Sequence, residues 1–200
     1  DAHRRSSAGI PPERKFFSKP KLAKEMIERI ISSGLAFKWA AGDSVYGDDR
    51  GLRIWLEEKG KAYVFAVSGK EYIDAGFHQY RVSDVLASLP EEGWVRMSAG
   101  DGSKGPRMYD WLLREINSPL RKGWKRWLLV RRSVRDPQEL KAHVACAPAK
   151  TALSELVRIA GIRWAIEVSF EDAKQETGLD EYEVRSFTGW YRHITLSMFA

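Results

Sequence analysis

Apolar and polar positions follow a helical period in two N-terminal segments. In LAKEMIERIISSG, residues 22–34, apolar side chains recur every three or four positions and a glycine follows them. This pattern predicts an amphipathic helix that ends near Gly34. RGLRIWLEEKG, residues 50–60, predicts a second helix with Leu52, Trp55 and Leu56 on its inner face.

Apolar runs next to these helices predict strands. LAFKWAAGD, residues 35–43, is typical of a buried strand, and KAYVFAVS, residues 61–68, predicts another. Helix, strand, helix and strand at this spacing predict a mixed α/β sheet with crossover helices. Strands are also predicted in RWLLVRRSV and KAHVACAP, at 126–134 and 141–148.

The C-terminal part is predicted to be helical. Residues 152–178 predict one long helix, or two helices joined near Gly161, and a last helix is expected to begin near Trp190. Between the two ends, residues 69–125 contain short aromatic stretches broken by Gly and Pro, which predict a β-rich insertion. The predicted divisions are therefore 1–68, 69–125 and 126–200. The tryptophans of the middle region are interpreted either as core or as a platform for an unpaired base: Trp94, Trp111, Trp124 and Trp127.

Composition narrows the class of protein. The chain has 200 residues, 44% of them hydrophobic, which is enough for a sizeable core. Lys and Arg number 33 against 27 Asp and Glu, and this net charge of +6 favours a polyanionic partner, although an ordinary basic protein has the same balance. A single cysteine excludes an intrachain disulfide, and the histidines show no zinc-ligand spacing. No apolar run approaches the ~18 residues of a membrane span, so we expect a soluble protein inside a cell that has no membrane partner.

The two ends have the character of internal sequence. The chain begins without Met in polar, proline-containing sequence that predicts a loop, and it stops inside an apolar helical pattern. We therefore expect a segment of a longer protein.

Two acidic residues are candidates for catalysis. Asp43 ends an apolar strand, the position where catalytic groups of open α/β sheets commonly lie, but an aspartate there also commonly caps the next turn. Glu167 lies on a predicted helix where Arg163, Glu171 and Lys174 fall within about one quarter of the circumference around it. This basic edge fits phosphate contact, but it is equally typical of a solvated helix face with an Arg163–Glu167 pair.

These residues bring a family into view. GDSVYG after a strand, and RWAIEVSFEDAKQETGLDEYEVRSFTGWYRHITL later, resemble bacterial insertion-sequence transposases of the DDE superfamily, from about Ala8 to Ala200. The resemblance implies an α/β, RNase H-like (retroviral-integrase-like) core interrupted by a β-rich insertion. Arg163, Glu167 and Lys174 match the family's Y-x2-R-x3-E-x6-K signature, but its tyrosine position holds Ala160.

The resemblance also implies a set of site residues. Asp43 corresponds to the second catalytic acid and Glu167 to the third, and both would hold Mg²⁺, with Mn²⁺ as a substitute. The first acid has no candidate, because Asp1 lacks a preceding strand. Basic side chains would contact the DNA backbone, with Arg163 and Lys174 next to the metal-bound phosphate and a further edge beyond them: Arg185, Arg192 and His193.

The function implied is DNA transposition in the bacterial nucleoid. Transposon ends would be nicked by hydrolysis, and the freed 3′-hydroxyl would attack target DNA, with two subunits pairing on double-stranded DNA. With two of three expected acids, the chain alone is predicted to bind DNA without turnover. Two alternatives stay open: an RNase H-like nuclease or resolvase that only hydrolyses, and an inactive DNA-binding transposase remnant.

Overall fold

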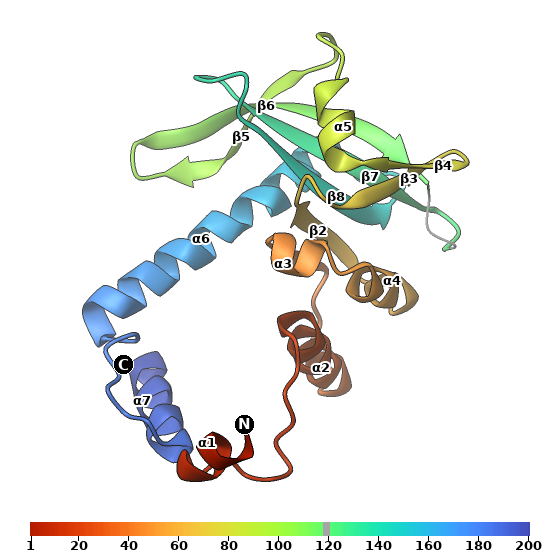
Figure 1. Ribbon diagram of the computed structural model, residues 1–200. Helices are drawn as coiled ribbons and strands as arrows, with labels where there is room; N and C mark the ends of the chain where they lie inside the picture. The colour runs from red at the N-terminus through yellow and green to blue at the C-terminus, as the bar shows by residue number, and fades with distance from the viewer. Residues whose placement is uncertain (118–120) are drawn as a thin grey trace. The chain divides into compact units, whose positions relative to one another are not determined.

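The computed structural model describes residues 1–117 and 121–200, and these form two compact units. One unit comprises residues 18–163, and the other combines residues 1–17 with residues 164–200. Each unit is described by itself below, and Figure 1 labels their helices and strands.

A six-stranded sheet forms the centre of the larger unit (Figure 1). The first two strands along the sheet are parallel, and all other neighbours are antiparallel. Their order across the sheet is β1 (Trp39–Gly42), β2 (Ala62–Val67), β8 (Leu140–Pro148), β7 (Trp124–Ser133), β6 (Gly105–Ile116) and β5 (Val95–Gly102). A separate hairpin pairs β3 (Tyr72–Ala75) with β4 (His78–Arg81).

Helices connect and cover these strands. The larger unit contains α2 (Lys19–Ser32), α3 (Ser44–Gly47), α4 (Arg50–Glu58), α5 (Val82–Ala87) and the first part of α6 (Leu153–Thr177). The predicted helices at 22–34 and 50–60 are confirmed by α2 and α4. α6 passes Gly161 without a break, so the alternative of one long helix is the correct one.

One predicted strand differs from expectation. β1 covers only Trp39–Gly42 of the predicted 35–43, and all four of its residues are half-buried rather than buried. The physical reason is its place at the edge of the six-stranded sheet, where a strand has a hydrogen-bonded neighbour on one side. β2, its inner neighbour, is buried along nearly its whole length, as expected for a strand covered on both faces.

The sheet has a separate apolar core on each face. On one face, Leu52 and Leu56 of α4 pack among side chains of the sheet that include Phe65. On the other face, Leu156 and Ile159 of α6 pack with residues that include Val64. Consecutive strand residues point to opposite faces, which is why adjacent residues of β2 belong to different cores. The mixed α/β architecture is compatible with an RNase H-like fold.

The strands of the predicted insertion take part in this same sheet. β5 and β6 lie within 69–125 and pair in succession with β7. Residues 118–120 of that range lie outside the described residues. Trp111 and Trp127 are 1% and 5% exposed, so they belong to the core and cannot stack on a base. Trp94 and Trp124 are half-buried, and the guanidinium of Arg132 lies 4.1 Å from the Trp94 ring.

A buried ion pair joins α4 to the sheet. Arg126 on β7 binds both carboxylate oxygens of Glu57, with Nε–Oε1 and Nη2–Oε2 distances of 3.0 and 2.7 Å, and the Tyr63 hydroxyl donates to Oε1 at 2.7 Å. Burial, together with the charge of Glu57, raises the pKa of Tyr63 well above its ordinary value. Removing one partner of such a pair is strongly destabilising, because the other charge remains buried.

The smaller unit is built from both ends of the chain. It contains α1 (Ala2–Ser7), the last part of α6 and α7 (Phe187–Phe199), and the Phe187 amide donates to the Ala8 carbonyl at 2.8 Å. The predicted N-terminal loop was wrong for α1, because the Asp1 carboxylate caps this helix by accepting from the His3 amide at 3.0 Å. Asp1 therefore precedes a helix, which agrees with its rejection as a catalytic acid. The predicted last helix is confirmed by α7.

The buried His143 of β8 makes a specific prediction about stability and pH. Burial, aided by the nearby charges of Arg131, Arg163 and Lys141, lowers the pKa of His143 to about 4, and its Nδ1 has no hydrogen-bond partner among the described residues. The unfolded chain takes up this proton near pH 6.5 and the folded chain only near 4, so stability present above 6.5 is lost as the pH falls between these values.

From pH 7 to pH 4, this one group should cost about 3 kcal/mol of unfolding free energy. Replacing His143 with Phe should reduce the acid loss by that amount, measured by urea unfolding at each pH. Parallel pH profiles for the two proteins would contradict the assignment.

Candidate active site

Asp43 occupies the carboxyl end of β1, as predicted. It is the first residue after the strand and the N-cap of α3, and its Oδ1 accepts a hydrogen bond from the Val45 amide at 2.9 Å. The residue is half-buried, and no other hydrogen bond or ion pair of Asp43 is found within the described part of the chain. The capping alternative is therefore real, but capping uses one carboxylate oxygen and leaves Oδ2 available to a ligand.

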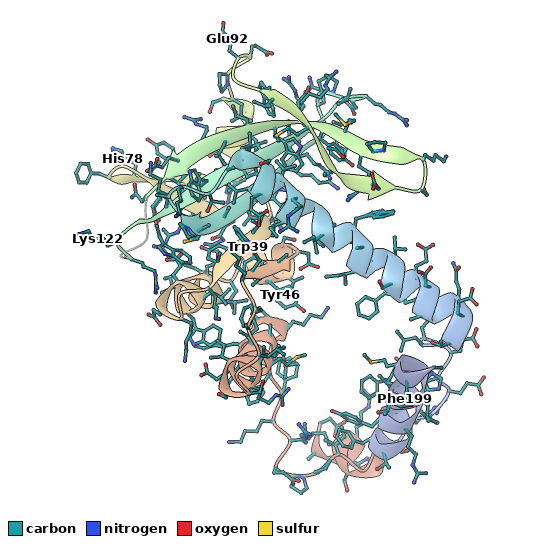
Figure 2. All side chains as sticks on the ribbon, turned by 180° about the vertical axis from the view of Figure 1, so that it is seen from behind. Trp39, Tyr46, His78, Glu92, Lys122 and Phe199 are labelled. Carbon is teal, nitrogen blue, oxygen red and sulfur yellow. The ribbon has the colours of Figure 1, made fainter. Side chains whose placement is uncertain are left out.

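A close approach of two backbones holds α3 in this place. Gly47 is buried, and a Cβ built on it would lie 1.8 Å from the carbonyl oxygen of Ala66 on β2. Only glycine allows the helix to lie so close to the strand. A Cβ on Gly42 would lie 3.1 Å from the Tyr46 ring, so the glycine before Asp43 is also crowded. Figure 2 labels Trp39 and Tyr46, which precede and follow Asp43 in the sequence.

The other acids of this loop have structural partners. Asp48 Oδ1 accepts from the Ser68 amide at 2.8 Å, and Asp49 caps α4 by accepting from the Leu52 amide at 2.7 Å. Both bonds fix the path of the chain between α3 and β2. Among the three aspartates of residues 43–49, Asp43 is thus the one that precedes α3 at the strand end.

Sequence reasoning missed Arg53, which supports the same loop. Its side chain is buried, donates to the Gly47 carbonyl oxygen and lies 2.6 Å from Glu71 Oε1. A signal was present in the sequence, because Arg53 precedes Leu56 by three residues and therefore shares the inner face of α4. The arginine connects the end of α3 to the chain that follows β2.

Glu167 lies on α6 within the smaller unit, whereas Asp43 belongs to the larger one. The prediction that Arg163, Glu167 and Lys174 share one helix is confirmed. Glu167 and Lys174 are exposed, and Lys174 Nζ lies 3.6 Å from Asp180 Oδ2. An exposed pair of this kind contributes at most ~1 kcal/mol and is readily exchanged for a phosphate contact.

The remaining basic residues of the predicted DNA edge differ from one another. Arg185 and Arg192 are exposed, the first before α7 and the second on it. His193 is half-buried, with its Nε2 2.9 Å from the Gly178 carbonyl oxygen and its ring 5.9 Å from that of Tyr182. His193 therefore takes part in the packing of its unit, and a DNA contact of this residue stays a prediction.

The donor chemistry of the candidate acids fits magnesium. Mg²⁺ prefers hard oxygen ligands and is typically held by one or two carboxylates, water and substrate phosphate. Asp43 Oδ2 and the Glu167 carboxylate are such donors. No group of three or more His, Cys, Asp or Glu side chains with the arrangement of a metal site occurs among residues 1–117 and 121–200. Within the same ranges, no helix has the length and apolar character needed to cross a bilayer.

Substitution of Gly47 tests the close approach that positions Asp43. Gly47→Ala should lower the unfolding free energy by about 1–3 kcal/mol, because the new methyl group overlaps the Ala66 carbonyl and forces the backbone to move. Gly51→Ala on α4 is the matched control, because its Cβ would meet only an Asp49 carboxylate oxygen, at 3.2 Å. Chemical denaturation measures both, and equal stabilities of the two variants would refute the close contact.

Comparison with known proteins agrees with the resemblance seen in the sequence. A family model described as DDE superfamily endonuclease matches residues 1–98, a range that includes Asp43 and ends before Glu167. No curated protein matches the chain. Endonucleases of this superfamily act on DNA and generally depend on a divalent metal, in agreement with the basic charge and the exposed carboxyl groups. The chain is therefore a DDE transposase-like protein, related to the DDE superfamily endonucleases.

Proposed function

We propose that this chain is part of an insertion-sequence DNA transposase that cleaves DNA strands and transfers them to a target. The observation that carries the proposal is the position of Asp43, which follows β1 at the edge of the parallel pair and lies inside the segment matched to the endonuclease family. In open α/β sheets, ligands bind at the carboxyl ends of the strands. The GDSVYG turn and the R-x3-E-x6-K helix are the further support.

Each proposed site residue has a separate task. Asp43 Oδ2 and Glu167 would hold Mg²⁺, or Mn²⁺ in its place, and the Val45 amide keeps the Asp43 carboxylate in one orientation. A bound divalent ion activates the attacking oxygen and stabilises the leaving oxygen in phosphoryl transfer. Arg163 and Lys174 would hold the phosphate, the first by a bidentate contact and the second as a point charge. Arg185, Arg192 and His193 would contact the DNA backbone.

The proposed reaction has two displacements at phosphorus. In the first, water attacks a phosphodiester at the transposon end, which breaks the bond to the 3′-oxygen and leaves a 3′-hydroxyl. In the second, this hydroxyl attacks a phosphodiester of target DNA, forms the new 3′–5′ linkage and releases a target 3′-hydroxyl. No covalent bond to the protein is needed in either displacement.

The partners follow from this chemistry. They are double-stranded DNA, as transposon ends and as target, and a second subunit that pairs the two ends. We also propose that residues 69–125 are an insertion between the second and third acidic residues of an RNase H-like core, although two of its strands, β5 and β6, extend the main sheet.

Asp43→Asn separates catalysis from capping. Asparagine is as good an N-cap as aspartate, so the bond from the Val45 amide and the stability of the chain should be retained. The negative charge needed by a metal ion is lost. We expect strand nicking by the natural protein that carries this chain, on a plasmid with the DNA bordering its gene, to fall by about 100-fold or more in Mg²⁺. Wild-type nicking would leave Asp43 as a cap alone.

Glu167→Gln tests the third acid with a matched control on the same helix. Glu171, one turn further along α6, is also an exposed glutamate. We expect Glu167→Gln to abolish nicking and joining to a similar extent as Asp43→Asn, and Glu171→Gln to retain most of both. Strand transfer by Glu167→Gln at the wild-type rate would eliminate this role. Nicked product without joined product, in the unsubstituted protein, would instead identify a nuclease that only hydrolyses.

A further inference from the structure

The β5–β6 hairpin meets α6 at a single crowded point. A Cβ built on Gly161 would lie 1.9 Å from the carbonyl oxygen of Ala99, so the helix backbone lies directly against the strand. Both residues are buried. β5 is irregular at this place, because its register with β6 shifts between Ser98 and Asp101. The bulge turns the Ala99 carbonyl out of the regular ladder and toward the helix.

One arginine side chain bridges this point of contact. Arg107 on β6 donates from Nη2 to the Ala99 carbonyl at 2.6 Å and to the Gly161 carbonyl at 3.1 Å, and from Nε to the Asp101 carbonyl at 3.1 Å. The side chain is half-buried, and this loss of solvent lowers the pKa of Arg107 from its ordinary value. A carbonyl in the middle of α6 is thereby tied to the bulge of β5.

We propose that Arg107 is a positioning residue for the active site: by clasping the β5 bulge to α6 at Gly161, it sets the course of the helix that carries Glu167. This role rests on the proposed function of Glu167. Glu167 follows Gly161 by six residues on the same helix, a rise of ~9 Å. A small change of direction at the clasp therefore displaces the carboxylate, and a misplacement of ~1 Å can cost on the order of 100-fold in rate.

The contact requires the geometry of arginine. Its planar guanidinium presents donors in fixed directions, so one group can reach carbonyls of the bulge and of the helix together. Lysine places a single charge at the end of a flexible chain and cannot hold the three carbonyl oxygens at once. Gly161 is the second requirement, because any side chain there would push the helix away from Ala99.

The test compares Arg107→Lys with Arg114→Lys in the natural protein that contains this chain. Arg114 lies on the same strand, is exposed and makes no hydrogen bond to α6 in the described part of the chain, so it is the matched control. The first readout is binding of Mn²⁺ alone, followed by electron paramagnetic resonance. We expect Arg107→Lys to weaken binding by about 10- to 100-fold, the usual effect of losing support behind a metal ligand. Arg114→Lys should bind as the unsubstituted protein does.

A double substitution shows whether Arg107 acts through Glu167. If it does, Arg107→Lys combined with Glu167→Gln should bind Mn²⁺ no more weakly than Glu167→Gln alone, because the two changes are coupled. The melting temperature, measured in parallel, should fall by only a few degrees in Arg107→Lys. Gly161→Ala provides a second approach to the same contact and should weaken Mn²⁺ binding as well.

Each outcome decides between the two claims. If Glu167→Gln weakens Mn²⁺ binding but Arg107→Lys and Gly161→Ala do not, the positioning role is overturned and the proposed function stands. Fully additive effects in the double variant also overturn it, because Arg107 would then act independently of Glu167. If Glu167→Gln itself leaves Mn²⁺ binding and nicking unchanged, the proposed function fails, and the positioning role fails with it.

Discussion

Two contacts between a helix backbone and a strand backbone determine much of the geometry near the candidate acids. At Gly47 the backbone of α3 lies against the Ala66 carbonyl of β2, and at Gly161 the backbone of α6 lies against the Ala99 carbonyl of β5. Neither place has room for a Cβ atom. Asp43 precedes the first contact by four residues, and Glu167 follows the second by six. In both places an arginine is hydrogen-bonded to the carbonyl of the glycine itself.

These arginines belong to a wider use of charged side chains inside the larger unit. Arg126 binds Glu57 in the core beside Tyr63, and Arg53 bridges Gly47 and Glu71. Such groups are tolerated in an apolar interior only when their hydrogen bonds are satisfied. His143 solves the same problem differently, because it stays neutral at physiological pH, with its pKa lowered to about 4. The interior thus depends on specific polar pairs as well as on the two apolar cores.

The two interpretations of Asp43 are compatible within one side chain. Capping α3 engages Oδ1, and the hydrogen bond from Val45 fixes the carboxylate in one orientation. A preorganised carboxylate is a better metal ligand than a freely rotating one, so the capping bond supports the proposed role. The same logic extends to α6, where the proposed clasp of Arg107 would fix the course of the helix before Glu167. In both places, structural contacts support the residues proposed for chemistry.

The sequence by itself determined the main elements and their order. Periodicity predicted α2, α4 and the strands β2, β7 and β8, because each carries an apolar pattern that suits one period only. It also located Asp43 at a strand end and Glu167 on a helix, and the resemblance to DDE transposases was visible in GDSVYG and in the C-terminal motif. These features are local, since they depend on residues close together in the chain.

Only the tertiary structure decided which residues meet across the chain. It joined β5 and β6 to the main sheet, buried Trp111 and Trp127, and brought Arg107 to Gly161. It also showed Gly47 and Gly161 to be sites of close approach, whereas in the sequence each looks like an ordinary turn or helix-joining glycine. The physical reason is that strand pairing and backbone contact join residues tens of positions apart, and no local pattern of side chains records those partners.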